Sequence, residues 1–181
     1  MWDNNIIPIN LVGIINVAEG PISVNEEKSN YFLSFAIIGY IDRTEERTML
    51  KQENLRTHRR DEMIDITAQV ARAVSQDGIE DGIAVVYCPH TTAGIAINEN
   101  ADPDVKHDVL LRLDEVYPWN HPGYRHAEGN TASHLKAITT GASQTIIVSG
   151  GRLVLGRWQG IYFCEFDGPR ERSYYIKTIQ G

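Results

Sequence analysis

Short apolar runs of strand length fill much of the chain from Ile83 to the C-terminus, and residues typical of turns close most of them. Runs of this length and composition favour strands over helices. Strands of this kind can bury a core only by pairing into sheets that pack against another layer. The pattern predicts strands over residues 83–88, 94–97, 145–148, 159–166 and 173–179.

Three segments between these runs have the features of helices. Residues 65–76 place Ile66, Val70 and Val74 at four-residue steps, and Gly78 provides a stop signal. This spacing puts the three apolar side chains on one face of an amphipathic helix.

The second predicted helix begins at Asp102-Pro103, an N-cap acceptor followed by proline at the first helical position. It ends before Pro118, and its apolar stripe is expected to be Val105, Val109, Leu113 and Val116. A third helix is predicted over residues 130–140 and is closed by Gly141.

The mostly polar segment 50–56 is predicted to be an exposed edge strand. The whole pattern predicts an α+β fold with more strand than helix and a largely antiparallel sheet. At 181 residues, the chain is long enough for one domain with a sizeable core and an extension.

The sequence pattern of residues 1–48 differs from that of the rest of the chain, because the apolar residues there follow no sustained period. The longest, from Tyr31 to Ile41, is shorter than the roughly twenty residues that span a bilayer. No basic leader or small-residue cleavage site accompanies it, so we expect a cytoplasmic protein that binds no membrane.

Charge and cysteine content narrow the possible partners. The formal net charge of -7 argues against nucleic-acid binding, which needs basic surface. Cys88 and Cys164 both lie in apolar runs and are expected to be buried free thiols.

Histidines are the first candidates for chemistry. His90 follows a predicted strand, His121 and His126 lie in a loop rich in Pro and Gly, and His134 lies on the third helix. Three neutral imidazoles that converge form a common catalytic metal site, usually with zinc. A loop histidine is also a common surface residue, and spacing alone does not show convergence. His58 and His107 are expected to be solvated.

Carboxylates and a glycine-rich segment accompany these histidines. Glu99 and Asp108 flank the start of the second helix, and either is a candidate general base. In "SGGRLVLGRWQGIYFCEFDGPRER", Trp158 and Gln159 are candidate pocket walls, and the candidate phosphate ligands are Arg152, Arg157, Arg170 and Arg172. The glycine spacing matches neither a P-loop nor a dinucleotide fingerprint, and structural turns would explain it as well.

Three motifs, "HTTAGIAINENADPDVKHD", "YRHAEGN" followed by "SHLKA", and "GRLVLGRWQGIYFCEFDGPRER", resemble the YjbQ-like family. Its members are known as secondary thiamine-phosphate synthase enzymes. The resemblance covers residues from about 49 to 181 as one domain. It leaves 1–48 as an extension, which we expect to be a misread start codon or a lineage-specific addition. Intact mass of the natively expressed protein distinguishes the two.

The resemblance implies a compact β-rich sandwich that forms a homotrimer. It also selects the site residues. His90, His126 and His134 become the expected metal ligands, and Glu99 and Asp108 the expected catalytic carboxylates. Asn98, Arg152, Trp158 and Gln159 are expected to contact substrate; Arg157 stands where the family usually has threonine.

Three functions remain open at this stage. The first is a thiamine-phosphate synthase-like transfer that joins a pyrimidine methyl diphosphate to a thiazole phosphate, either as the main activity or as a side activity. The second is a metal-dependent hydrolase or lyase that uses metal-activated water. The third is a trimeric protein that binds a metal or a small molecule without catalysis. The expected ligands are phosphorylated small molecules and a divalent metal ion, with zinc favoured.

Overall fold

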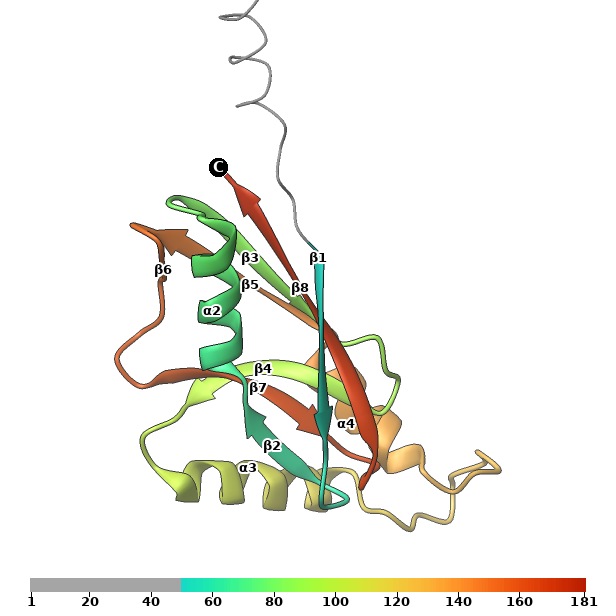
Figure 1. The fold of residues 1–181 in the computed structure, drawn as a ribbon. Coiled ribbons are helices and arrows are strands. Elements are labelled where there is room, and N and C mark those ends of the chain that lie inside the picture. Colours follow the sequence, from blue (N-terminus) through green and yellow to red (C-terminus); the bar gives the residue numbers. More distant parts are fainter. Residues whose placement is uncertain (1–49) are drawn as a thin grey trace, which may run out of the picture. The chain divides into compact units, whose positions relative to one another are not determined.

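The computed structural model describes residues 50–181, and the predicted extension lies outside them. These residues form two sheets and three helices (Figure 1). The five-stranded sheet has the order β1 (Leu50–Arg56), β8 (Glu171–Gln180), β3 (Gly82–Tyr87), β5 (Ser143–Ser149) and β6 (Arg152–Leu153). The three-stranded sheet has the order β2 (Glu62–Asp65), β7 (Gln159–Glu165) and β4 (Ala93–Glu99).

Every strand pair is antiparallel, which confirms the predicted α+β class and sheet type. Segment 50–56 is indeed an edge strand of the larger sheet. Strands β2 and β6, which have only four and two residues, are not predicted from the sequence.

The three predicted helices are confirmed. They are α2 (Thr67–Asp77), α3 (Pro103–Val116) and α4 (Thr131–Thr140). Gly78 ends α2 with φ of 67°, a left-handed conformation that glycine adopts without strain. The carboxylate of Asp102 accepts a hydrogen bond from the amide of Asp104 at 2.9 Å and caps α3 as expected.

The main core lies between the two sheets and includes the apolar face of α2. Strand β7 contributes to both sides of the smaller sheet: Ile161 and Phe163 join the main core, whereas Tyr162 and Cys164 face the side that α3 and α4 cover. The smaller sheet is therefore an inner layer. Both cysteines are buried and free, and burial raises the pKa of the Cys88 thiol to about 11 and of the Cys164 thiol to about 12.

Apolar side chains remain exposed on two surfaces of the molecule, one on α3 and one on the five-stranded sheet. In the predicted stripe of α3, Val105, Val109 and Leu113 are half-buried and Val116 is exposed, and the helix has no fully buried residue. On the five-stranded sheet, the face away from α2 carries Ile83 between Ile147 and Ile179. Tyr87 stacks on Tyr175 on that face, with ring centroids 6.5 Å apart. In the described part of the chain, no helix is long and apolar enough to cross a membrane.

Candidate functional site

His134 has the environment of a metal ligand. It lies on α4, and its Nδ1 is 3.1 Å from the carbonyl oxygen of Thr91. The carbonyl can only accept, so this contact assigns the proton of the neutral ring to Nδ1 and leaves a lone pair on Nε2. Nε2 is buried and has no hydrogen-bond partner. A histidine held in this way, with one nitrogen bonded to a carbonyl and the other free, is typical of metal ligation.

His126 lies beside His134. The two ring centroids are 5.2 Å apart and the rings are nearly perpendicular. The Nε2 atom of His126 is 3.6 Å from a carboxylate oxygen of Glu128. The fold therefore brings together His126, from the loop before α4, and His134, from α4 itself.

His90 shares a cavity of about 470 Å³ with His134, and the exposed side chains of Tyr87 and Ile138 border it. Its Nε2 lies 3.0 Å from the carbonyl oxygen and 3.1 Å from the amide nitrogen of Ser173, so this ring nitrogen is engaged by the backbone of β8. Burial and then the nearby Arg172 guanidinium lower the pKa of His90, which favours the neutral imidazole.

The fit to a three-histidine metal site is therefore incomplete within one chain. His134 and His126 fit as neighbouring ligands, whereas Nε2 of His90 is occupied. Among residues 50–181, no three His, Cys, Asp or Glu side chains form a group able to hold a metal ion.

A buried ion pair supports the loop that carries His90. Glu165 is fully buried, and both of its carboxylate oxygens accept hydrogen bonds from Arg172, at 2.6 and 2.7 Å. Arg172 also donates to the hydroxyl of Thr92 at 2.8 Å. Sequence reasoning missed this pair because its two members lie on different strands, seven residues apart.

Asn98, Glu99, Trp158 and Gln159 come together at a second place, where β4 ends and β7 begins. Glu99 and Gln159 are directly paired across the two strands. The side chain of Asn98 accepts from the amide of Glu99 at 2.8 Å, and that of Gln159 accepts from Gly156 at 2.7 Å. Trp158 is 55% exposed, and the guanidinium of Arg157 lies 4.9 Å from its ring. These side chains border solvent beside one carboxylate.

A polar network not predicted from the sequence holds the chain in place where β4 ends and β7 begins. The amide of Asn100 donates to Asp65 at 2.7 Å, and its oxygen lies 2.6 Å from the hydroxyl of Tyr162. A Cβ at Gly160 would come within 2.9 Å of the Asn100 side chain, so glycine is needed there. Burial opposes ionisation of Asp65, but hydrogen bonds from Thr67 and Asn100 lower its pKa and keep it charged.

These two places lie at opposite ends of the same strand. Ala93, next to the His90 loop, and Glu99 are six residues apart on β4, and a strand rises about 3.3 Å per residue. The two ends of β4, one beside the His90 loop and the other at Glu99, are thus about 20 Å apart in one chain. Asp108 and Arg152 lie apart from both groups: Asp108 pairs with exposed His107 on α3, and Arg152 is on the edge strand β6.

The comparisons with known proteins agree on one family. The family model described as "UPF0047 protein YjbQ-like" matches residues 51–181. The UPF0047 protein YugU of Bacillus subtilis is 65% identical over 131 residues, which cover 72% of this chain and 99% of YugU. A UPF0047 protein of Methanocaldococcus jannaschii is 51% identical and is covered over 94% of its length.

Solved structures share the fold. A YjbQ/UPF0047 family protein of Clostridium acetobutylicum has a TM-score of 0.70 and 55% identity, with 71% of this chain and 99% of that chain covered. A protein of Sulfolobus solfataricus has a TM-score of 0.71 and 32% identity, with 75% and 99% covered.

Proposed function

Because the chain belongs to the UPF0047 protein YjbQ-like family, we propose that it is a small-molecule enzyme whose active site is assembled between copies of a homotrimer. The proposed reaction is thiamine-phosphate synthase-like, as the family resemblance implies. The observation that carries the proposal is the separation of most of the expected site residues into two groups at opposite ends of β4.

The two groups complement each other chemically. The histidine end holds His90, His126 and His134 near Arg172, whereas the other end holds Glu99, Asp65 and the amides of Asn98, Asn100 and Gln159. Exposed apolar side chains flank both: Tyr87 and Ile138 at the first, and Trp158 at the second. Hydrogen-bonding side chains at both ends and their apolar rims support a head-to-tail contact, and three such contacts close into a ring.

The apolar face of the five-stranded sheet supports the same assembly. Tyr87, Ile147 and Tyr175 share this face, and Ile147 is 62% exposed. An apolar sheet face of this kind is typical of a surface that another subunit covers.

The proposed chemistry suits two such half-sites. The thiazole nitrogen attacks the methylene carbon of the pyrimidine, the bond from that carbon to the diphosphate oxygen breaks, and diphosphate leaves with the electron pair. The reaction needs positioning and stabilisation of the leaving charge. The histidines are suited to the phosphates, and the amide side chains with Glu99 to the aminopyrimidine.

The direct test is product formation from the two phosphorylated substrates. Purified full-length protein should form thiamine phosphate, measured by chromatography after oxidation to a fluorescent product. The Glu99→Gln and Gln159→Ala variants should each lose at least about tenfold in rate, whereas Glu115→Gln, an exposed carboxylate change on α3, should not. Absence of product from the wild type with Mg²⁺ and with Zn²⁺ would refute the proposed reaction.

A metal-dependent hydrolase or lyase is the second candidate, and the buried, unpartnered Nε2 of His134 favours it. His134 and His126 would hold the ion, zinc by preference, and another copy would complete its ligands. When bound, the ion would lower the pKa of a water molecule. Elemental analysis should find about one zinc per subunit in the wild type and much less in His126→Ala and His134→Ala. If the protein binds metal but turns over no phosphorylated substrate, the remaining function is binding of a metal or a small molecule without catalysis.

A further inference from the structure

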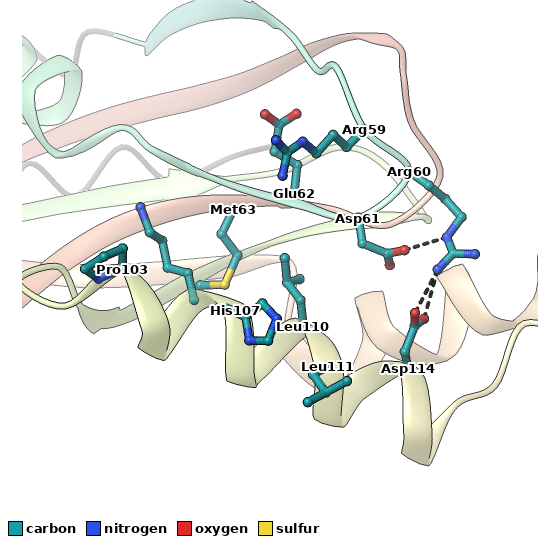
Figure 2. Close-up of a pocket in the computed structure, with 11 residues that line it drawn as sticks. Arg59, Arg60, Asp61, Glu62, Met63, Pro103, His107, Leu110, Leu111 and Asp114 are labelled. Atoms are coloured by element: carbon teal, nitrogen blue, oxygen red, sulfur yellow. Dashed lines mark hydrogen bonds and ion pairs between the residues drawn. The ribbon is translucent and has the colours of Figure 1, made fainter.

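A cleft of about 730 Å³ lies between α3 and the segment from Arg59 to Met63 (Figure 2). One wall is formed by the segment that enters β2, and the other by residues at helical spacing on α3, from Pro103 to Asp114. Its volume falls in the range of roughly 300–1,000 Å³ that is usual for small-molecule sites. The cleft contains none of the residues assigned to the proposed active site.

The middle of the cleft is apolar. Met63 and Leu110 approach each other there from the two walls, and Leu111 lies at the edge with 49% of its surface exposed (Figure 2). Since α3 has no fully buried residue, part of its apolar surface remains available to a ligand in the cleft.

At one end, the acidic side chains are already neutralised. The guanidinium of Arg60 donates to Asp61 at 2.5 Å and to both carboxylate oxygens of Asp114 (Figure 2). The fully buried ammonium of Lys136 also donates to both carboxylates. Burial opposes the charge on Asp114, but Lys136 and Arg60 lower its pKa, so it stays ionised and paired.

Elsewhere on the walls, positive charge is left over. Within residues 50–181, neither Arg59 nor Lys106 makes a salt bridge. The ammonium of Lys106 lies 5.8 Å from the centroid of the Tyr162 ring and helps to lower the pKa of Asp65 without a direct contact. Glu62 is the remaining carboxylate of the lining, and it accepts a hydrogen bond from the amide of His58 at 2.8 Å. The cleft thus combines an apolar middle with two cationic side chains that form no salt bridge within residues 50–181.

We propose that this cleft is a second ligand site, which binds a small amphipathic anion: a phosphate or carboxylate carried on an apolar body. The apolar body contacts Met63, Leu110 and Leu111, and the anionic group pairs with Lys106 and Arg59. Guanidinium and ammonium groups form charge-assisted hydrogen bonds with such anions, and the apolar contact supplies affinity that an inorganic ion would lack.

Calorimetric titration of the full-length protein with 1-naphthyl phosphate tests this site. The wild type should bind in the micromolar to submillimolar range, and 1-naphthol, which lacks the charge, should bind at least about tenfold more weakly. Titration with 1-naphthoate determines whether a carboxylate is accepted in place of the phosphate. Lys106→Gln and Arg59→Gln should each weaken binding of the phosphate by about tenfold, and Leu111→Glu should abolish it.

The matched control is Arg112→Gln, which removes the same charge from α3 at a residue outside the cleft and should leave affinity unchanged. Glu99→Gln and His134→Ala should also bind normally, which separates this site from the proposed active site. No binding to the wild type, equal affinity in the Lys106 and Arg59 variants, or loss of binding in the Glu99 or His134 variants would each overturn the proposal.

Discussion

At the scale of single residues, the fold contains a buried ion pair, Glu165–Arg172, whose two members depend on each other. A carboxylate with no solvent exposure depends on Arg172 for charge compensation, and Arg172 in turn holds Thr92 beside the His90 loop. Breaking such a pair from one side leaves an uncompensated buried charge. The candidate site therefore depends on an ion pair that makes no contact with the cavity of His90 and His134.

We predict that Arg172→Ala lowers the free energy of unfolding by about 3–5 kcal/mol, measured by urea denaturation. Arg170→Ala provides the control, because Arg170 pairs with Asp167 at the surface and is 52% exposed. That change should cost no more than about 1 kcal/mol. Equal losses in the two variants would show that burial of Glu165 has no special energetic weight.

His90 should titrate below its ordinary pKa of 6.5, because burial and Arg172 both disfavour the imidazolium. The unfolded chain then takes up the proton first as pH falls, so the contribution of His90 to stability is complete above pH 6.5 and is lost below it. An NMR titration of ¹³C-labelled histidine, with His90→Gln to assign the signal, measures this. A midpoint at or above 6.5 would contradict the environment described here.

At the scale of elements, α3 is fixed mainly at its start. The Asp102 side chain caps the helix, whereas no residue of the helix itself is fully buried. Asp102→Ala should therefore lower the free energy of unfolding by about 1 kcal/mol. Asp108→Ala, on the exposed surface of the same helix, should change it by less than about 0.5 kcal/mol. A circular dichroism melt of both variants gives the comparison.

The elements predicted correctly from the sequence are those whose signals are local. Four-residue apolar spacing with Gly78, and Asp102 followed by Pro103, each define a helix end within a few residues. Strand β6 gave no such signal because it has only two residues and depends on its pairing with β5. The stripe of α3 has the right period, but burial depends on what covers the helix, which periodicity does not report.

At the scale of the whole molecule, the family motifs selected residues that one chain does not bring together. His134 and His126 do meet, and Glu99 meets Gln159, but β4 separates the two groups. Sequence similarity selects residues by position along the chain, whereas their convergence depends on the fold and on assembly. The Asp65–Asn100–Tyr162 network and the cleft beside α3 arise from long-range contacts in the same way.

Assembly itself is testable. If other copies cover the apolar face of the larger sheet, light scattering should give the mass of a trimer for the full-length protein. Ile147→Glu should shift it to the monomer, because a charge on this face would be buried without a partner. Val116→Glu, a similarly exposed apolar position on α3, should remain trimeric. A monomeric wild type would remove the proposed arrangement.

The central claim is that one active site takes its histidines from one copy and Glu99 from another, and subunit mixing tests it most directly. Once wild-type turnover is established, His134→Ala and Glu99→Gln, each expected to retain no more than about a tenth of wild-type activity alone, are mixed in equal amounts, unfolded together and reassembled. Random assembly of a ring with sites between copies should restore about one quarter of wild-type activity, since that fraction of sites draws both intact halves from different copies. Mixed trimers with no activity would place each site within a single chain and contradict the account.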